Sequence, residues 1–245
     1  MKWNIGCSGF GYKEWKGIFY PDKLAQTKWL EFYGTHFNTV ELNMTFYRFP
    51  ELKLLEGWYN KSPDKFSFTV KVPRSITHYK KLIDAEKLLQ EFYSVCKEGL
   101  KDKLGPLLFQ FPPQFTYTPE NLQRILTNLD SNFTNVVEFR HFSWWHQEVY
   151  NQLKKANITF CGISHPTLPN DVIINTQKVY YRFHGVPKIF YSSYDKNFID
   201  AVAEKISANN TLTDIYCYFN NTAAVAAIHN AQSLQLVIAG NKKGT

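Results

Sequence analysis

Acidic, basic and imidazole side chains recur at the ends of short apolar segments along this 245-residue chain. Several occur two residues apart: Glu41 with Asn43, Glu138 with Arg140, and Arg182 with His184. Side chains two residues apart in a β-strand point to the same face, so each pair would project together from a strand end. Carboxylate, guanidinium and imidazole groups brought together in this way can transfer protons and bind anions.

Two mechanisms remain open for these groups. In a metal-free mechanism, Glu138 is a general acid or base, and His184 transfers a proton opposite Glu41. In a metal-dependent mechanism, the same three residues and His78 bind a divalent ion. No H-x-H, H-x-x-x-H or D-x-D spacing accompanies them, so the sequence favours the metal-free mechanism and leaves the metal open.

The remaining candidate side chains are polar or aromatic and suit substrate binding. We predict that the following residues contact the substrate: Asn43, Tyr47, Lys71, His78, Gln110, Arg140, Arg182, Tyr194 and Asn220. Basic side chains come from three separate segments, and a dry site lined by three cations is costly unless an anion fills it. The sequence therefore predicts a phosphate-bearing substrate, such as a phosphoester or a nucleic-acid phosphodiester.

Other functions are also compatible with this set of residues. The net charge of +7 and the 17% aromatic content would suit non-catalytic binding of nucleic acid or a phosphorylated ligand. A carboxylate pair with aromatic walls, here Tyr47, Trp144 and Tyr194, would suit a glycoside hydrolase. The glutamates and arginines would alternatively pair with each other as a structural network. No dinucleotide fingerprint occurs at residues 6–11, so neither nicotinamide nor flavin is expected.

Eight short apolar, β-branched or aromatic segments must position these side chains. They span residues 3–8, 39–43, 66–71, 106–111, 135–140, 158–164, 179–184 and 215–220. Helical patterns alternate with them, which is typical of repeated βαβ units. We predict an α/β fold with one domain over residues 1–245, a (β/α)8 TIM-type barrel. Active sites of such barrels lie at the C-terminal ends of the strands, where these polar residues fall.

The intervening helices are predicted from apolar periodicity and capping residues. They span residues 24–37, 82–100, 194–208 and 222–238, with others beginning at Pro119 and after Ser143 as a cap. Residues 165–177 are rich in Pro and Asn and predict an irregular segment between the sixth and seventh strands.

Composition limits the cellular context. The four cysteines lack C-x-x-C spacing, which predicts buried free thiols. Neither a signal peptide nor an apolar stretch long enough to cross a membrane is present, so a cytoplasmic protein without membrane contact is expected. The oligomeric state is left open.

The motifs that contain these residues resemble a known family over essentially the whole chain. They are GCSGFGYKEWKGIFYP (6–21), VELNMTFYRFP (40–50), FSFTVKVPRSITH (66–78), KLGPLLFQFPPQF (103–115), VVEFRHFSWW (136–145), YYRFHG (180–185) and CYFNNT (217–222). This pattern is similar to that of the YecE-like family, domain of unknown function 72. The resemblance implies a TIM barrel and leaves the reaction open; Phe10 stands where the family usually has tryptophan.

Overall fold

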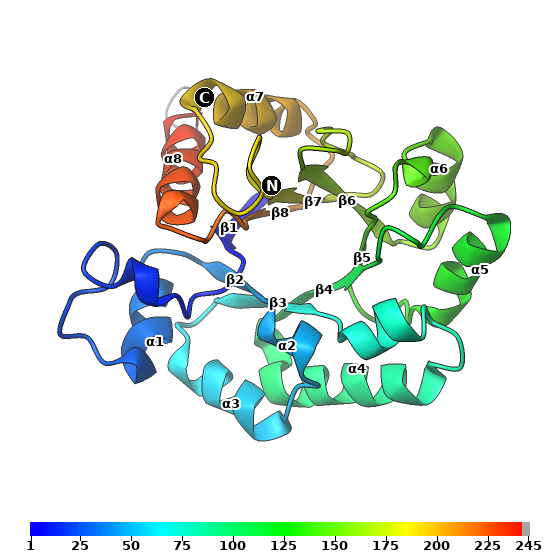
Figure 1. Ribbon diagram of the computed structural model, residues 1–245, viewed down its shortest axis with the longest axis horizontal. Coiled ribbons are helices and arrows are strands. Elements are labelled where there is room, and N and C mark those ends of the chain that lie inside the picture. Colours follow the sequence, from blue (N-terminus) through cyan, green and yellow to red (C-terminus); the bar gives the residue numbers. More distant parts are fainter. Residues whose placement is uncertain (242–245) are drawn as a thin grey trace.

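Eight parallel strands form the centre of the protein in a computed structural model that describes residues 1–241. The strands are β1 (Lys2–Cys7), β2 (Thr39–Leu42), β3 (Ser67–Lys71), β4 (Leu104–Gln110), β5 (Asn135–Glu138), β6 (Thr159–Ser164), β7 (Lys178–Phe183) and β8 (Asp214–Phe219). Each overlaps one predicted segment, and helices follow them in the alternation expected of a single (β/α)8 barrel. The strands form a central ring in Figure 1, with the longer helices outside it.

The sheet runs in the order β1-β8-β7-β6-β5-β4-β3-β2, and side chains bridge the seam between β1 and β2. The Cys7 N–H donates to Tyr33 Oη at 2.7 Å, and the same hydroxyl donates to the Thr39 carbonyl at 3.0 Å. Asn38 Oδ1 accepts from the Ile5 N–H at 3.1 Å. These bonds satisfy backbone groups that would otherwise lack a hydrogen-bond partner in the interior.

The helices are α1 (Trp29–Gly34), α2 (Met44–Tyr47), α3 (Leu52–Lys61), α4 (Glu86–Leu100), α5 (Pro119–Asn128), α6 (Gln147–Lys155), α7 (Lys196–Ser207) and α8 (Ala226–Asn241). The residues around the start of α5 explain why the helix begins there. Thr118 Oγ1 accepts from the Asn121 N–H at 3.1 Å, and Pro119 occupies the first turn, where no N–H is needed.

Several helix predictions need correction. Helices α1, α4 and α8 begin four or five residues later than predicted, and α2 and α3 were not predicted. Ser143 does not cap α6; its hydroxyl accepts from the Tyr117 N–H at 2.9 Å, and His146 precedes the helix instead. The signal for α3 was the spacing of Leu55 and Trp58, whose side chains are buried. Residues 165–177 contain no helix, as predicted.

The barrel interior is filled with side chains in layers, and it becomes polar toward the C-terminal ends. In the deeper layer, Tyr218 Oη lies 2.6 Å from Thr39 Oγ1 and 2.8 Å from Thr69 Oγ1. In the next layer, Tyr180 Oη donates to Glu41 Oε2 at 2.5 Å. The barrel is thus a packed core that supports the predicted site from below.

Two further predictions bear on the context. All four cysteines are free and buried, as predicted. No helix within residues 1–241 is long and apolar enough to cross a membrane.

Candidate functional site

The predicted polar residues converge on one pocket of about 800 Å³ at the C-terminal ends of the strands. We call it the mouth pocket. Its lining includes Asn43, Tyr47, Lys71, His78, Gln110, Arg140, Arg182 and Asn220. Glu41, Glu138 and His184 are fully buried beneath the pocket, and Tyr194 lies away from it. Eight of the seventeen residues that line the pocket are thus ones that the sequence singled out, and their roles stay predictions.

A buried ion network forms the floor of the mouth pocket. Arg182 Nη2 contacts Glu41 Oε1 at 2.6 Å, and Arg182 Nη1 contacts Glu138 Oε2 at 2.5 Å. Arg140 Nη2 lies 2.5 Å from Glu138 Oε1. Both carboxylates have no exposed surface, and Arg182 is only 1% exposed. Buried charges need such partners, so this part of the polar cluster has a structural role.

The network fixes the protonation of Glu138. Burial alone would raise the pKa of this carboxyl group, but the charges of Arg140, Arg182 and Lys71 outweigh burial and lower its pKa to about 2. A carboxylate with so low a pKa is a weak proton acceptor at neutral pH. Glu138 is therefore better suited to hold the arginines in place than to act as a general base.

His184 is held neutral beneath the pocket. Burial lowers the pKa of this imidazole well below its usual value, and Arg140 and Arg182 lower it further. Arg140 Nη2 lies 3.1 Å from Nε2, and the Asn220 side-chain amide lies 2.9 Å from Nδ1. The Asn220 atom at this distance is Nδ2. Because a guanidinium only donates, Nε2 accepts, so a neutral imidazole carries its proton on Nδ1, and the Asn220 amide must be turned by 180° for its oxygen to accept that proton. His184 thus positions Arg140 and Asn220.

The histidines around the pocket should make the folded protein less stable at acidic pH. Burial, followed by nearby cations, lowers the pKa of His78 and of His165 to about 4, from 6.5. As the pH falls from 6.5 toward 4, the unfolded chain takes up protons that the folded histidines resist, so stability decreases. Urea unfolding between pH 7 and 4.5 should show this decrease, with a smaller slope in His184→Gln. An unchanged slope in that variant would contradict the assignment of a neutral buried His184.

Lys71 is the one lysine among residues 1–240 that lines the mouth pocket. Its Nζ lies 4.1 Å from the centre of the Phe46 ring and has no hydrogen-bond or ion-pair partner in that part of the chain. Burial and the charge of Arg182 lower its pKa to about 7, although Glu138 and Glu41 act in the opposite direction. This amine is therefore present in both protonation states near neutral pH, as a proton-transfer group requires.

Exposed groups form the rim of the pocket on the β3 side. Arg74 lies 5.7 Å from the Tyr47 ring and 5.5 Å from the Tyr79 ring, and both tyrosines are about 70% exposed. One π-helical turn, Ser75–Tyr79, follows Arg74 and also carries His78. Sequence reasoning missed these lining residues: Tyr12, Phe46, Arg74, Tyr79, Pro113, His165, Thr167, Phe190 and Thr222. The sequence feature that could have identified Arg74 as a lining residue is its position three residues after Lys71, close to the end of β3.

The structure does not assemble the aromatic walls of a glycoside hydrolase. Tyr194 Oη accepts from the Gly185 N–H at 2.7 Å, and the ring packs on Phe183. Trp144 is buried, with its ring centre 3.9 Å from that of Phe139. The two carboxylates, moreover, contact the same buried guanidinium and do not flank a cavity.

The proposed metal ligands also have other partners. In the part of the chain that the structure describes, no three His, Cys, Asp or Glu side chains are placed to hold a metal ion. Glu41 and Glu138 form ion pairs with Arg182, and His184 Nε2 accepts a hydrogen bond from Arg140. The geometry therefore does not support that set as a ligand shell.

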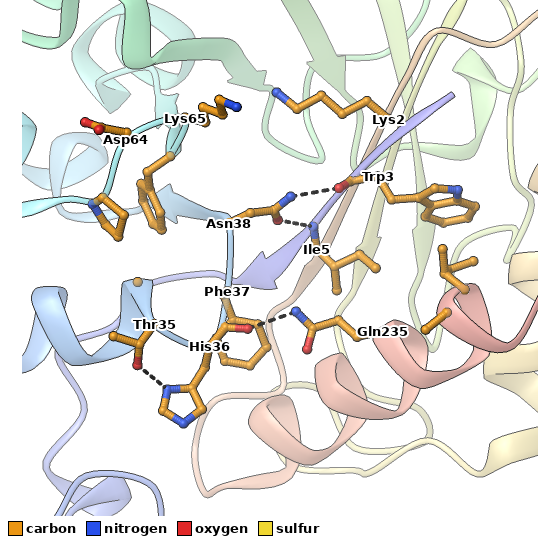
Figure 2. A pocket seen from close by; sticks show the side chains of 15 residues that line it. Lys2, Trp3, Ile5, Thr35, His36, Phe37, Asn38, Asp64, Lys65 and Gln235 are labelled. Atoms are coloured by element: carbon orange, nitrogen blue, oxygen red, sulfur yellow. Dashed lines mark hydrogen bonds between the residues drawn. The ribbon is translucent and has the colours of Figure 1, made fainter. Parts of the chain in front are cut away.

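A second pocket, of about 610 Å³, lies at the opposite end of β1 and β2 (Figure 2). Its amide side chains, Asn38 and Gln235, already have backbone partners. The Asn38 amide bonds to Trp3 and Ile5 across the seam, and Gln235 Nε2 donates to the His36 carbonyl at 3.0 Å. This pocket belongs to the closure of the barrel, so the mouth pocket remains the candidate site.

Known proteins share this architecture and these motifs. A family model described as "Protein of unknown function DUF72" matches residues 4–244. The chain is 31% identical to UPF0759 protein YunF of Bacillus subtilis, over 60% of this chain and 54% of YunF. It is 34% identical to UPF0759 protein YecE of Escherichia coli K12, over 62% of this chain and 53% of YecE. The matches thus span about half the length of these curated relatives.

Solved structures agree with the family match. The crystal structure of a DUF72 family protein from Thermotoga maritima superposes with a TM-score of 0.88 at 28% identity, covering 98% of this chain and all of that one. A DUF72 family protein from Enterococcus faecalis superposes with a TM-score of 0.80 at 20% identity, covering 97% of each chain, and supports the fold. The sequence motifs, the barrel and these matches agree: the chain belongs to the DUF72 family.

Proposed function

We propose that this protein is an enzyme that acts on a phosphate-bearing substrate in the mouth pocket. The charge of the pocket lining supports the proposal. Four basic side chains line it, Lys71, Arg74, Arg140 and Arg182, whereas no Asp or Glu within residues 1–241 does. The two buried glutamates balance Arg182 and Arg140 from below, which leaves Lys71 and Arg74 without counter-charges. A phosphate group would supply the missing negative charge and would accept their hydrogen bonds.

The reaction that we propose is hydrolysis of a phosphoester: water attacks the phosphorus atom, the P–O bond to the alcohol breaks, and the leaving oxygen takes up a proton. Arginines at the pocket floor would stabilise negative charge that develops on the phosphoryl oxygens. Lys71 would donate a proton to the leaving oxygen, because its pKa of about 7 is closer to neutral pH than the pKa of Glu138 is. This assignment moves the proton-transfer role that the sequence suggested for Glu138 and His184 to the amine that lines the pocket.

Replacement of Arg74 by alanine tests the binding part of this proposal. Arg74 is exposed and lies at the rim, so its loss should leave the fold intact. We expect the dissociation constant for ribose 5-phosphate to rise on the order of tenfold, because one charge-assisted contact is lost. Thermal-shift titration measures this change. Lys28→Ala, which removes a surface charge away from the pocket, is the matched control and should bind as the wild type does.

Turnover separates catalysis from simple binding. We expect activity on at least one member of a panel of phosphomonoesters and phosphodiesters, and its loss in Lys71→Met. Tight binding of phosphorylated ligands without turnover across that panel would favour the non-catalytic alternative.

The exposed rim favours nucleic acid as a second candidate ligand. Tyr47 and Tyr79 present rings beside Arg74, and such aromatic and cationic groups stack on bases and bind the backbone of single strands. A single-stranded oligonucleotide should then bind more tightly than a mononucleotide, and Tyr79→Ala should weaken the oligonucleotide alone. Equal affinities for the two ligands would exclude this candidate.

A further inference from the structure

An apolar pocket of about 420 Å³ adjoins the mouth pocket. Its lining is mainly apolar and includes Phe10, Trp29, Met44, Leu54 and Trp58. Tyr12 and Asn43 line both pockets, so the two cavities are neighbours that share a wall. The apolar pocket is formed by the segment after β1, the start of α1, the end of β2, the start of α2, and α3. No charged side chain within residues 1–240 lines it.

The shared wall contains a polar atom without a partner. Asn43 Oδ1 is buried and accepts no hydrogen bond from any of residues 1–240. A buried carbonyl oxygen left unpaired is costly, so rotation of the amide that brings this oxygen to a hydrogen-bond donor would be favourable. Because Asn43 lines both pockets, such a rotation would present the oxygen to a ligand N–H or O–H at their boundary.

The aromatic residues of the apolar pocket are held in fixed orientations. Trp29 stacks on Tyr20 with ring centres 4.6 Å apart and planes 4° apart. Phe10 and Trp58 meet edge to face at 6.3 Å. Met44 is 54% exposed and Leu54 36% exposed, so apolar surface remains at the entrance. Rigid aromatic walls with an open apolar entrance favour a planar ring as the occupant.

We infer that the two pockets bind opposite ends of one small substrate, a phosphate in the mouth pocket and an aromatic ring in the apolar pocket. The segment between the two ends donates a hydrogen bond to Asn43 Oδ1. This inference rests on the proposed function for the phosphate end and adds the class of group at the other end. It also gives the cluster of Phe10, Trp29 and Trp58 a role in specificity.

Matched ligands test the inference. Adenosine 5'-monophosphate, cytidine 5'-monophosphate and phenyl phosphate carry aromatic rings, whereas ribose 5-phosphate carries only a sugar and n-hexyl phosphate carries an aliphatic chain. We expect at least one phosphate with an aromatic ring to bind on the order of tenfold or more tightly than both ligands without one, the gain typical of ring stacking. Isothermal titration calorimetry gives these dissociation constants.

Gly11 offers a way to narrow the apolar pocket. It lines that pocket, and a Cβ atom added to it meets no other atom within 4 Å. A Cβ therefore has room at this position, and we expect Gly11→Leu to narrow the apolar pocket from its edge and to reduce the preference for the ring, while leaving ribose 5-phosphate binding unchanged. Gly240→Leu, at an exposed helical position that also has open space, is the matched control and should keep the preference.

The outcomes separate the two proposals. Equal affinities of all the phosphates, or a hexyl chain as effective as a ring, would overturn the inference and leave the proposed function standing. A ring preference that is not reduced in Gly11→Leu would also overturn it. Failure of every phosphate to bind would contradict the proposed function itself.

Discussion

Replacement of Arg182 by methionine should lower the free energy of unfolding by about 3–5 kcal/mol. The guanidinium contacts Glu41 and Glu138 at 2.6 and 2.5 Å in a fully buried environment, and its removal leaves Glu41 without its cation. For a domain of this size, the loss corresponds to a decrease in melting temperature of roughly 6–20 °C. Urea unfolding and thermal melting at pH 7 measure the two quantities.

Two variants show whether the unpaired Glu41 carboxylate causes the loss of stability in Arg182→Met. Arg48→Met removes an arginine from an exposed pair with Glu51 and should change stability by no more than about 0.5 kcal/mol. Adding Glu41→Gln to Arg182→Met should recover part of the lost stability, because the amide carries no charge. If Arg182→Met is as stable as the wild type, the buried ion network does not support the barrel as described.

Replacement of Lys71 by methionine should weaken sulfate binding at pH 6 on the order of 10- to 100-fold, the contribution of a hydrogen bond from a charged donor. Sulfate is a suitable probe because it stays fully ionised across this range. In the wild type, the affinity for sulfate should decrease as the pH rises through about 7, where Lys71 loses its proton. The low pKa of His78, about 4, keeps its titration outside this range.

Lys71→Arg is the informative control for this prediction. It keeps the positive charge at all accessible pH values, so binding should persist and the decrease near pH 7 should disappear. Calorimetric titrations between pH 6 and 9 measure both effects. If Lys71→Met retains the pH dependence of the wild type, another group titrates in the pocket and Lys71 is not the proton-transfer residue.

The sequence predicted the strands well because each is a short apolar run with a polar end. The boundaries moved slightly: Asn43, His184 and Asn220 are the first residues after β2, β7 and β8, and Arg140 is the second residue after β5. Helix α3 was missed because its apolar face is short and charged residues interrupt the pattern. Its burial depends on packing against α4, a contact that local sequence does not encode.

The sequence also indicated which residues gather at the mouth, but not how deeply each one lies. Glu138 and Arg140 share a strand end, yet Glu138 is fully buried and Arg140 reaches the pocket. Depth depends on the layer that a side chain occupies in the barrel and on its partner across the interior. Phe46 and Arg74 were missed for a related reason: Phe46 lies in the short helix α2, and Arg74 directly precedes the π-helical turn after β3.

Calorimetric titration with ribose 5-phosphate and with ribose at low ionic strength tests the central claim most directly. The two ligands differ only by the phosphate, which we place on the cations of the mouth pocket. We predict that ribose 5-phosphate binds at one site, that its affinity decreases as salt is added, and that ribose gives no binding heat. Equal binding of both sugars, or no binding of either, would contradict the account.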